Sequence, residues 1–223
     1  MQGWMFGADK EFWTPESVQS FLMDVPHDKM IIQDIGNDRF DVWKSLNAFN
    51  GKQWIFGFIH NYGGTNPIFG DFNYYQNTVS KLSNDPAHAN LKGFGVMPEG
   101  INNNSSVYEY LFDLAWGEEK DGFREWIAQY LKNRYGVDEK SIVDDWVLLS
   151  KNVYALKYWE PRWWGGAGSY LHNKRPAFDV AKISSFPGDQ KALLQVVKNY
   201  LQHVKENSTN NLMAYDLAEF ARH

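Results

Sequence analysis

Short apolar runs alternate with segments of helical periodicity through the first half of this 223-residue chain. The apolar runs, residues 2–6, 29–35, 54–59 and 91–97, are expected to form β-strands. The segments between them space their apolar side chains as amphipathic helices do. Such alternation predicts right-handed βαβ units around a parallel sheet. Four units of this kind amount to half of an eight-stranded barrel.

One helix start in this half is marked by its residue types. Thr14 suits the N-cap position, Pro15 the first helical position and Ser17 the third. A short helix or an irregular crossover is expected over residues 40–46, and a longer helix over about 72–82.

The pattern changes after the last apolar run, because the remaining segments all have helical periodicity. Five helices are expected, over residues 107–115, 123–131, 142–154, 189–205 and 211–222. The predicted fold is therefore α/β followed by all-α. Residues 1–116 would form the carboxyl-terminal half of a (β/α)₈ TIM barrel, and residues 117–223 the start of an α-helical domain.

The composition argues against several classes of function. A net charge of −5 without long single-sign runs leaves no electrostatic footprint for nucleic acid or an anionic membrane. Cysteine is absent, so there is no disulfide, no thiolate ligand and no cysteine nucleophile. The six histidines follow no metal-binding spacing and no nucleotide-binding fingerprint is present, so neither a metal nor a cofactor is expected. No run approaches the roughly 20 apolar residues of a membrane-spanning helix.

Glu99 is the candidate catalytic residue. It lies between Pro98 and Gly100, directly after the apolar run 91–97, where stiff backbone would hold a carboxylate at the carboxyl end of a strand. The plainer alternative is a turn whose Glu99 side chain merely faces solvent.

Polar or aromatic residues also follow the other expected strands. Trp4, Asp34, His60 and Asn61 would meet Glu99 at one rim, because parallel strands present their carboxyl ends together. Each has a plainer alternative: Trp4 as a core residue, His60 and Asn61 as caps of a strand, and Asp34 as an N-cap or ion-pair partner. Together they suit glycoside hydrolysis, in which one carboxyl group protonates the leaving oxygen while another attacks the anomeric carbon or activates water.

Three motifs carry a resemblance to a known family. Gln2-Gly3-Trp4, the run His60–Gly64 and the run Gly95–Gly100 occur in an order that resembles the α-N-acetylglucosaminidases, which are family 89 glycoside hydrolases. The resemblance extends through Tyr135-Gly136 to Tyr215-Asp216-Leu217, so it covers essentially the whole chain.

The resemblance implies a retaining hydrolase of glycans with terminal α-linked N-acetylglucosamine, with a small amino-terminal domain, a (β/α)₈ barrel and a helical carboxyl-terminal domain. Glu99 matches the nucleophile of the family. Trp4, His60 and Asn61 match its sugar-binding wall, and Asp34 matches a strand-end aspartate. Bacterial members are periplasmic or secreted and animal relatives are lysosomal. The natural glycan and the oligomeric state stay open.

One departure from the family pattern limits what the chain alone is expected to do. The general acid/base of the family is a glutamate preceded by asparagine, on a strand before the Gln-Gly-Trp motif with which this chain begins. We therefore expect a fragment without activity on its own. Two alternatives are a non-catalytic glycan-binding module, with Trp4, Tyr62 and Trp163 or Trp164 as stacking platforms, and a structural helical scaffold.

Overall fold

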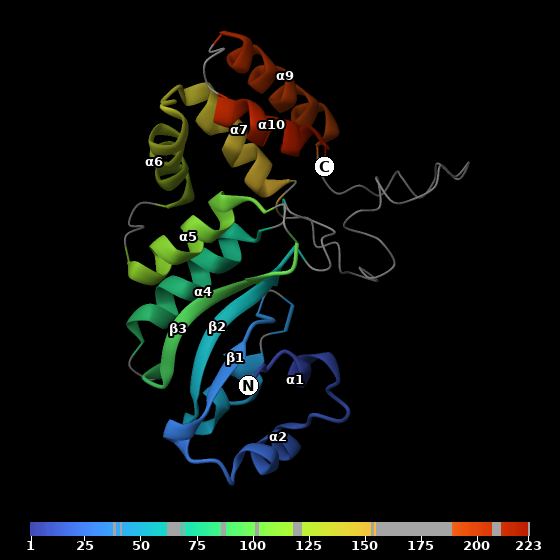
Figure 1. Ribbon diagram of the computed structural model, residues 1–223, viewed down its shortest axis with the longest axis vertical. Coiled ribbons are helices and arrows are strands. Elements are labelled where there is room, and N and C mark those ends of the chain that lie inside the picture. Colours follow the sequence, from blue (N-terminus) through green and yellow to red (C-terminus); the bar gives the residue numbers. More distant parts are fainter. Residues whose placement is uncertain are drawn as a thin grey trace, which may run out of the picture.

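A small parallel sheet with helices against it lies at the centre of the molecule, and further helices stack beyond it (Figure 1). The computed structural model describes residues 1–37, 39–40, 42–61, 68, 70–85, 88–100, 103–117, 122–152, 154, 189–206 and 211–222.

The sheet has three strands, β1 (Ile31–Asp34), β2 (Gln53–His60) and β3 (Leu91–Pro98). They are parallel and lie in the order β1-β2-β3, the same as their order in the chain. Between β1 and β2 come α3 (Val42–Ser45) and the 3₁₀ turn η2 (Ala48–Gly51), and α4 (Phe72–Asn84) joins β2 to β3. The predicted βαβ arrangement is confirmed for these strands.

The strand predicted over residues 2–6 is wrong. Only Gln2 joins the sheet, through a parallel bridge to Gln33, and the chain then enters the short helix α1 (Met5–Ala8). The reason is local: the amides of Phe6 and Gly7 donate back to the carbonyls of Gly3 and Trp4, both at 3.1 Å, instead of to a neighbouring strand.

The next helix follows its sequence signals closely. The helix α2 (Pro15–Leu22) begins after Thr14, whose Oγ1 accepts a hydrogen bond from the amide of Ser17 at 3.2 Å. The predicted N-cap and first helical residue are thus confirmed. A 3₁₀ turn, η1 (His27–Lys29), leads into β1.

One face of the sheet, which we name the covered face, packs against helices. The ring of Trp54 stacks on Trp43 of α3 with centroids 5.6 Å apart, and Phe58 stacks on Tyr75 of α4 at 4.6 Å. Side chains alternate between the two faces of a strand, so the strand register assigns further residues to this face. The covered face consists of Ile32, Asp34, Trp54, Phe56, Phe58, His60, Phe94 and Val96.

The opposite face of the sheet, which we name the open face, carries small and mixed side chains. It consists of Gln33, Ile55, Gly57, Ile59, Gly93, Gly95 and Met97. A Cβ atom built on Gly93 would meet no atom within 4 Å, and one built on Gly95 would meet only Ile55, at 3.6 Å. Ile59 is buried, but none of these residues belongs to the main hydrophobic cluster that packs against the helices.

The described residues after β3 form helices only, as predicted. They are α5 (Ser105–Trp116), α6 (Phe123–Tyr135), α7 (Lys140–Lys151), α9 (Gln190–Glu206) and α10 (Asn211–Arg222). The left-handed residues Gly117 and Gly136, with φ of 72° and 70°, end α5 and α6. In Figure 1, α5 lies beside α4, and α6, α7, α9 and α10 extend the stack away from the sheet.

Stacked and edge-on aromatic rings connect the sheet layer to these helices. The ring of Phe72 in α4 lies 4.5 Å from Phe123 of α6 and 5.1 Å from Tyr154, which follows α7. Tyr154 also accepts a backbone hydrogen bond from Gly70 at 3.0 Å. Among the helices that the structure describes, none is both long enough and apolar enough to cross a membrane.

Candidate active site at the carboxyl edge of the sheet

Glu99 lies at the carboxyl edge of the sheet and is exposed. Its amide donates to the carbonyl of His60 at 3.0 Å, which extends the β2–β3 ladder by one step beyond the end of β3. Strand alternation assigns position 99 to the same side as Met97, which belongs to the open face. The side-chain amide of Asn103 donates to the carbonyl of Gly100 at 2.5 Å.

His60 is fully buried on the covered face, beneath α5. Its Nδ1 atom lies 2.7 Å from the hydroxyl of Tyr108, and the two rings meet nearly edge-on with centroids 5.0 Å apart. Burial raises the pKa of Tyr108, so this hydroxyl keeps its proton at neutral pH. The contact therefore fixes the orientation of the imidazole.

Asp34 and Asn61 are buried at the same edge. Asp34, the last residue of β1, is fully buried on the covered face, and its carbonyl accepts from the side-chain amide of Asn37. Asn61 follows β2 with a left-handed φ of 51° and is 1% exposed. Asparagine tolerates this backbone conformation better than most residues, which suits a sharp turn at the end of a strand.

Trp4 contributes an exposed indole to this edge. The residue is 39% exposed, and its Nε1 donates to the side-chain oxygen of Gln2 at 3.1 Å. The amide nitrogen of Gln2 lies 3.9 Å from the sulfur of Met97. A chain of contacts thus crosses the open face, from the first residues of the protein to the strand that precedes Glu99.

The structure divides the predicted site residues between the two faces of the sheet. Trp4 and Glu99 are exposed at the carboxyl edge, whereas Asp34, His60 and Asn61 are buried there. The backbone connects His60 to Glu99 directly, while the imidazole turns away toward α5. The residues suggested as additional stacking platforms, Tyr62, Trp163 and Trp164, lie outside the described residues.

Two side chains that contribute to this edge were not among the predicted site residues. Gln2 orients the indole of Trp4, and Tyr108 holds the imidazole of His60. Gln2 belongs to the Gln2-Gly3-Trp4 motif that carried the family resemblance, and this was the available signal for it. The contact of Gln2 with Met97 spans 95 residues of the chain and that of Tyr108 with His60 spans 48, so only the folded structure pairs them.

The groups exposed along this edge include a carboxylate and an indole. A carboxylate can act as nucleophile or base, and an indole face can stack on a sugar ring. Within the described ranges, no group of three or more histidine, aspartate or glutamate side chains is arranged to hold a metal ion.

Two family models match the chain. Residues 1–118 match the model described as Alpha-N-acetylglucosaminidase (NAGLU) tim-barrel domain. Residues 126–223 match the model described as Alpha-N-acetylglucosaminidase (NAGLU) C-terminal domain. A curated relative, the alpha-N-acetylglucosaminidase of Homo sapiens, is 28% identical over 232 residues. That match covers 100% of this chain and 29% of the human protein, so the chain spans less than a third of the relative's length.

Solved structures from Clostridium perfringens have a similar fold. A family 89 glycoside hydrolase in complex with 2-acetamido-1,2-dideoxynojirmycin gives a TM-score of 0.75 at 23% identity, over 98% of this chain and 24% of that chain. A variant bound to its substrate GlcNAc-alpha-1,4-galactose gives a TM-score of 0.70 at 24% identity, over 88% of this chain and 22% of that chain. At these identities the likeness concerns the fold.

Proposed function

Because the chain belongs to the alpha-N-acetylglucosaminidase family, we propose that it carries the nucleophile half of a retaining glycosidase site. Glu99 is the nucleophile in this proposal. The acid/base glutamate comes from residues outside this chain, and β1, β2 and β3 form part of an eight-stranded barrel. The substrate is a glycan that ends in α-linked N-acetylglucosamine.

The proposed reaction has two steps. A carboxylate oxygen of Glu99 forms a bond to the anomeric carbon as the bond to the leaving oxygen breaks, and the external acid protonates that oxygen. Water, deprotonated by the same external group, then displaces Glu99 and restores the original anomeric configuration. This double displacement requires the two carboxyl groups to lie about 5–5.5 Å apart.

The observation that carries the proposal is the exposure of Glu99 at the carboxyl edge, where parallel α/β enzymes gather their reactive groups. The neighbouring open face supports it, since Gly93 and Gly95 leave space above the sheet for a ligand or for further strands. Trp4 offers an exposed ring at the same edge, which would form part of the sugar-binding wall.

The buried residues take supporting roles in the proposal. His60, held by Tyr108, braces the backbone to which the Glu99 amide is bonded. Asn61 and Asp34 shape the adjoining turns. One solved relative is bound to GlcNAc-alpha-1,4-galactose, and this supports an N-acetylglucosamine-containing substrate for the present protein.

The decisive experiment uses a longer protein that contains this chain together with the acid/base region. Glu99→Ala is expected to lower turnover of an aryl α-N-acetylglucosaminide by at least about 10⁴-fold, because no covalent intermediate can form. Added azide should restore turnover and yield the β-glycosyl azide, since a small anion can enter the space that the carboxylate leaves. Glu11→Ala, which changes an exposed glutamate, is the matched control.

Activity of Glu99→Ala within tenfold of the parent, or azide products of α configuration, would contradict the assignment. The isolated 223-residue chain should release no aryl leaving group. Measurable turnover by it would refute the proposal that the acid/base glutamate comes from residues outside this chain.

The exposed indole of Trp4 also favours a second candidate, a glycan-binding module. In that case the isolated chain would bind N-acetylglucosamine in an NMR titration, and Trp4→Ala would abolish the shifts.

A further inference from the structure

The strand β3 has the burial of an edge strand. It is the last strand of the sheet, so among the described residues it has a neighbouring strand on one side only (Figure 1). No residue of β3 is buried, whereas β2, which lies between two strands, is buried at every position except Gln53 and Ile55. The side of β3 away from β2 is therefore a candidate surface for a further strand.

The hydrogen bonds between β2 and β3 fix which backbone groups point to that outer side. In a parallel strand, the N–H and C=O of one residue point to the same side, and those of the next residue point to the other. The amide of Glu99 donates to β2, and the carbonyl oxygen of Gly95 faces β2 as well. Phe94 and Val96 consequently direct their N–H and C=O groups to the outer edge.

These outward groups have no hydrogen-bond partner among the residues that the structure describes. The amides and carbonyls of Phe94 and Val96 take part in none of the hydrogen bonds made outside the strand ladders. Their side chains are only partly buried on the covered face. The edge ends at Pro98, which has no N–H to donate. A short stretch centred on Gly95 is thus a template for one further strand.

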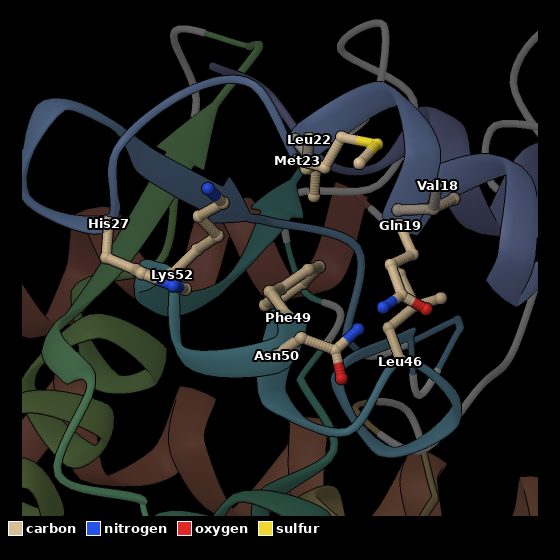
Figure 2. Close-up of a pocket in the computed structure, with 9 residues that line it drawn as sticks. All are labelled: Val18, Gln19, Leu22, Met23, His27, Leu46, Phe49, Asn50 and Lys52. Atoms are coloured by element: carbon tan, nitrogen blue, oxygen red, sulfur yellow. The ribbon is translucent and has the colours of Figure 1, made fainter.

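The outer edge of β1, in contrast, is already paired. There the amides of Gly3 and Gln33 donate to the carbonyls of Gln33 and Met1, both at 2.7 Å, before the chain enters α1. A cavity of about 210 Å³ lies between α2 and η2 (Figure 2), but none of its lining residues belongs to a strand. The β3 edge is therefore the surface that offers unpaired strand backbone within the described ranges.

The length of the relatives indicates what can occupy this edge. Residues 1–118 match a tim-barrel domain, while the described sheet has three strands. The match covers 29% of the human relative and 24% of the chain of a solved relative, so most of each lies outside it. A barrel closes only when each edge strand is paired. The unmatched part of such a protein can supply a strand for β3.

We propose that the outer edge of β3 binds a parallel strand of a separate polypeptide that carries the unmatched part of the barrel domain. The identity of this partner rests on the proposed function, whereas the pairing rests on the unpaired edge. Phe94 and Val96 would form about four hydrogen bonds with the incoming strand, through two donors and two acceptors. Gly93 and Gly95 leave room on the open face for larger side chains of that strand.

The test combines the 223-residue chain with the rest of the longer protein described above, expressed as a separate polypeptide. Analytical ultracentrifugation should detect a one-to-one complex. In this complex the amides of Phe94 and Val96 should exchange hydrogen at least about 100-fold more slowly than in the chain alone. The amides of Gly95 and Met97, which point toward β2, should change much less.

Val96→Pro removes one outward N–H and leaves the hydrogen bonds to β2 in place, because proline is tolerated where the N–H of an edge strand faces away from its neighbour. It should weaken the complex at least about tenfold. Val96→Ala is the matched control, since it shortens the same side chain and keeps the N–H. Its affinity should stay within about threefold of the parent. If Val96→Pro does not fold, hydrogen exchange of the parent complex decides the question.

The proposal would be overturned if no complex formed, if Phe94 and Val96 exchanged as fast in the complex as in the chain alone, or if both variants weakened it equally. Protection of these amides in a dimer of the 223-residue chain alone would overturn it in favour of a second copy as the occupant. Turnover of an aryl α-N-acetylglucosaminide is a separate readout. A protected complex without turnover would support the strand pairing and contradict the proposed function.

Discussion

A single carboxylate joins two helices of the carboxyl-terminal half. The Oδ2 atom of Asp216 in α10 accepts hydrogen bonds from Nε of Arg134, at 3.0 Å, and from the hydroxyl of Tyr135 at the end of α6. The side chains of Arg134 and Asp216 are only 25% and 16% exposed. Burial raises the pKa of Tyr135, which keeps its hydroxyl protonated as a donor.

We expect Asp216→Ala to lower the free energy of unfolding by about 2 kcal/mol, because it leaves a partly buried guanidinium and a hydroxyl without their acceptor. Urea denaturation of the chain measures this change. Asp144→Ala is the matched control, since the Arg124–Asp144 pair is 42% and 50% exposed and should contribute less than about 0.5 kcal/mol. Equal effects of the two substitutions would contradict the expectation.

Asp145, which lies between α7 and α9, is expected to make a contribution to the stability of the fold that depends on pH. It is 8% exposed and accepts from the side-chain amide of Asn199 at 3.0 and 3.2 Å. Burial raises the pKa of Asp145 in the folded protein. Because the folded state then binds the proton more tightly, the stabilising contribution is present below the unfolded pKa and is lost as pH rises through the folded pKa.

The free energy of unfolding of the Asp145→Asn variant, relative to that of the parent, should therefore increase as the pH rises. The neutral amide keeps an acceptor for Asn199 and no longer ionises. Urea denaturation of both proteins at about pH 3.5 and at pH 7 tests this, with a larger relative stability of the variant expected at pH 7. If the difference in the free energy of unfolding between the two proteins stays constant with pH, a raised pKa of Asp145 in the folded protein is ruled out.

At the scale of elements, the pairing of β2 with β3 depends on close approach at two glycines. Gly57 and Gly95 are register partners, and a Cβ atom on Gly57 would lie 2.3 Å from the carbonyl oxygen of Gly95. That oxygen belongs to the backbone, so it cannot rotate away. The strands can keep their spacing only if position 57 has no side chain.

We expect Gly57→Ala to destabilise the chain by about 2 kcal/mol or more, because the two strands must separate to admit the methyl group. Gly93→Ala is the matched control on the same face, where an added Cβ meets nothing within 4 Å. It should change stability by less than about 0.5 kcal/mol, or increase it by restricting the unfolded chain. Denaturant midpoints compare the two, and similar losses would argue against the close approach.

At the scale of the whole molecule, an aromatic seam joins the α/β layer to the helices. The ring of Tyr110 in α5 lies 4.8 Å from Trp126 of α6, and Trp146 of α7 stacks on Tyr154 at 6.1 Å. The indole of Trp126 also donates to Asp113 at 2.6 Å. The contacts of Trp126 with Tyr110 and with Asp113 run across the position near residue 117 where the sequence suggested a domain boundary.

We expect the described core to unfold as one cooperative unit, because the seam buries rings from both sides of that position. Far-ultraviolet circular dichroism and tryptophan fluorescence should give coincident urea transitions. Phe72→Ala, which removes a ring that contacts both halves, should lower both transitions together by about 3 kcal/mol or more. Two separate transitions would show that the halves fold independently.

Much of the fold follows from sequence pattern, because helix and strand periodicities are local properties. The three parallel strands, the cap at Thr14 and the helices after β3 were all predictable. The strand expected over residues 2–6 was not formed, since apolar alternation cannot report that Gly3 and Trp4 bond back to their own segment. The left-handed turn that begins at Asn47 was not predicted either, because its course through Ala48 and Phe49 depends on the distant Asn90.

For the candidate site, the sequence alone indicated which residues lie at one edge of the sheet, since parallel strands present their ends together. It could not assign a face to each, because that depends on strand register and on where each strand ends. Only the tertiary structure turned His60 toward Tyr108, linked Gln2 to Met97 and left Glu99 exposed. These are contacts between segments far apart in the chain, and they exist only after the strands have paired and the helices have packed.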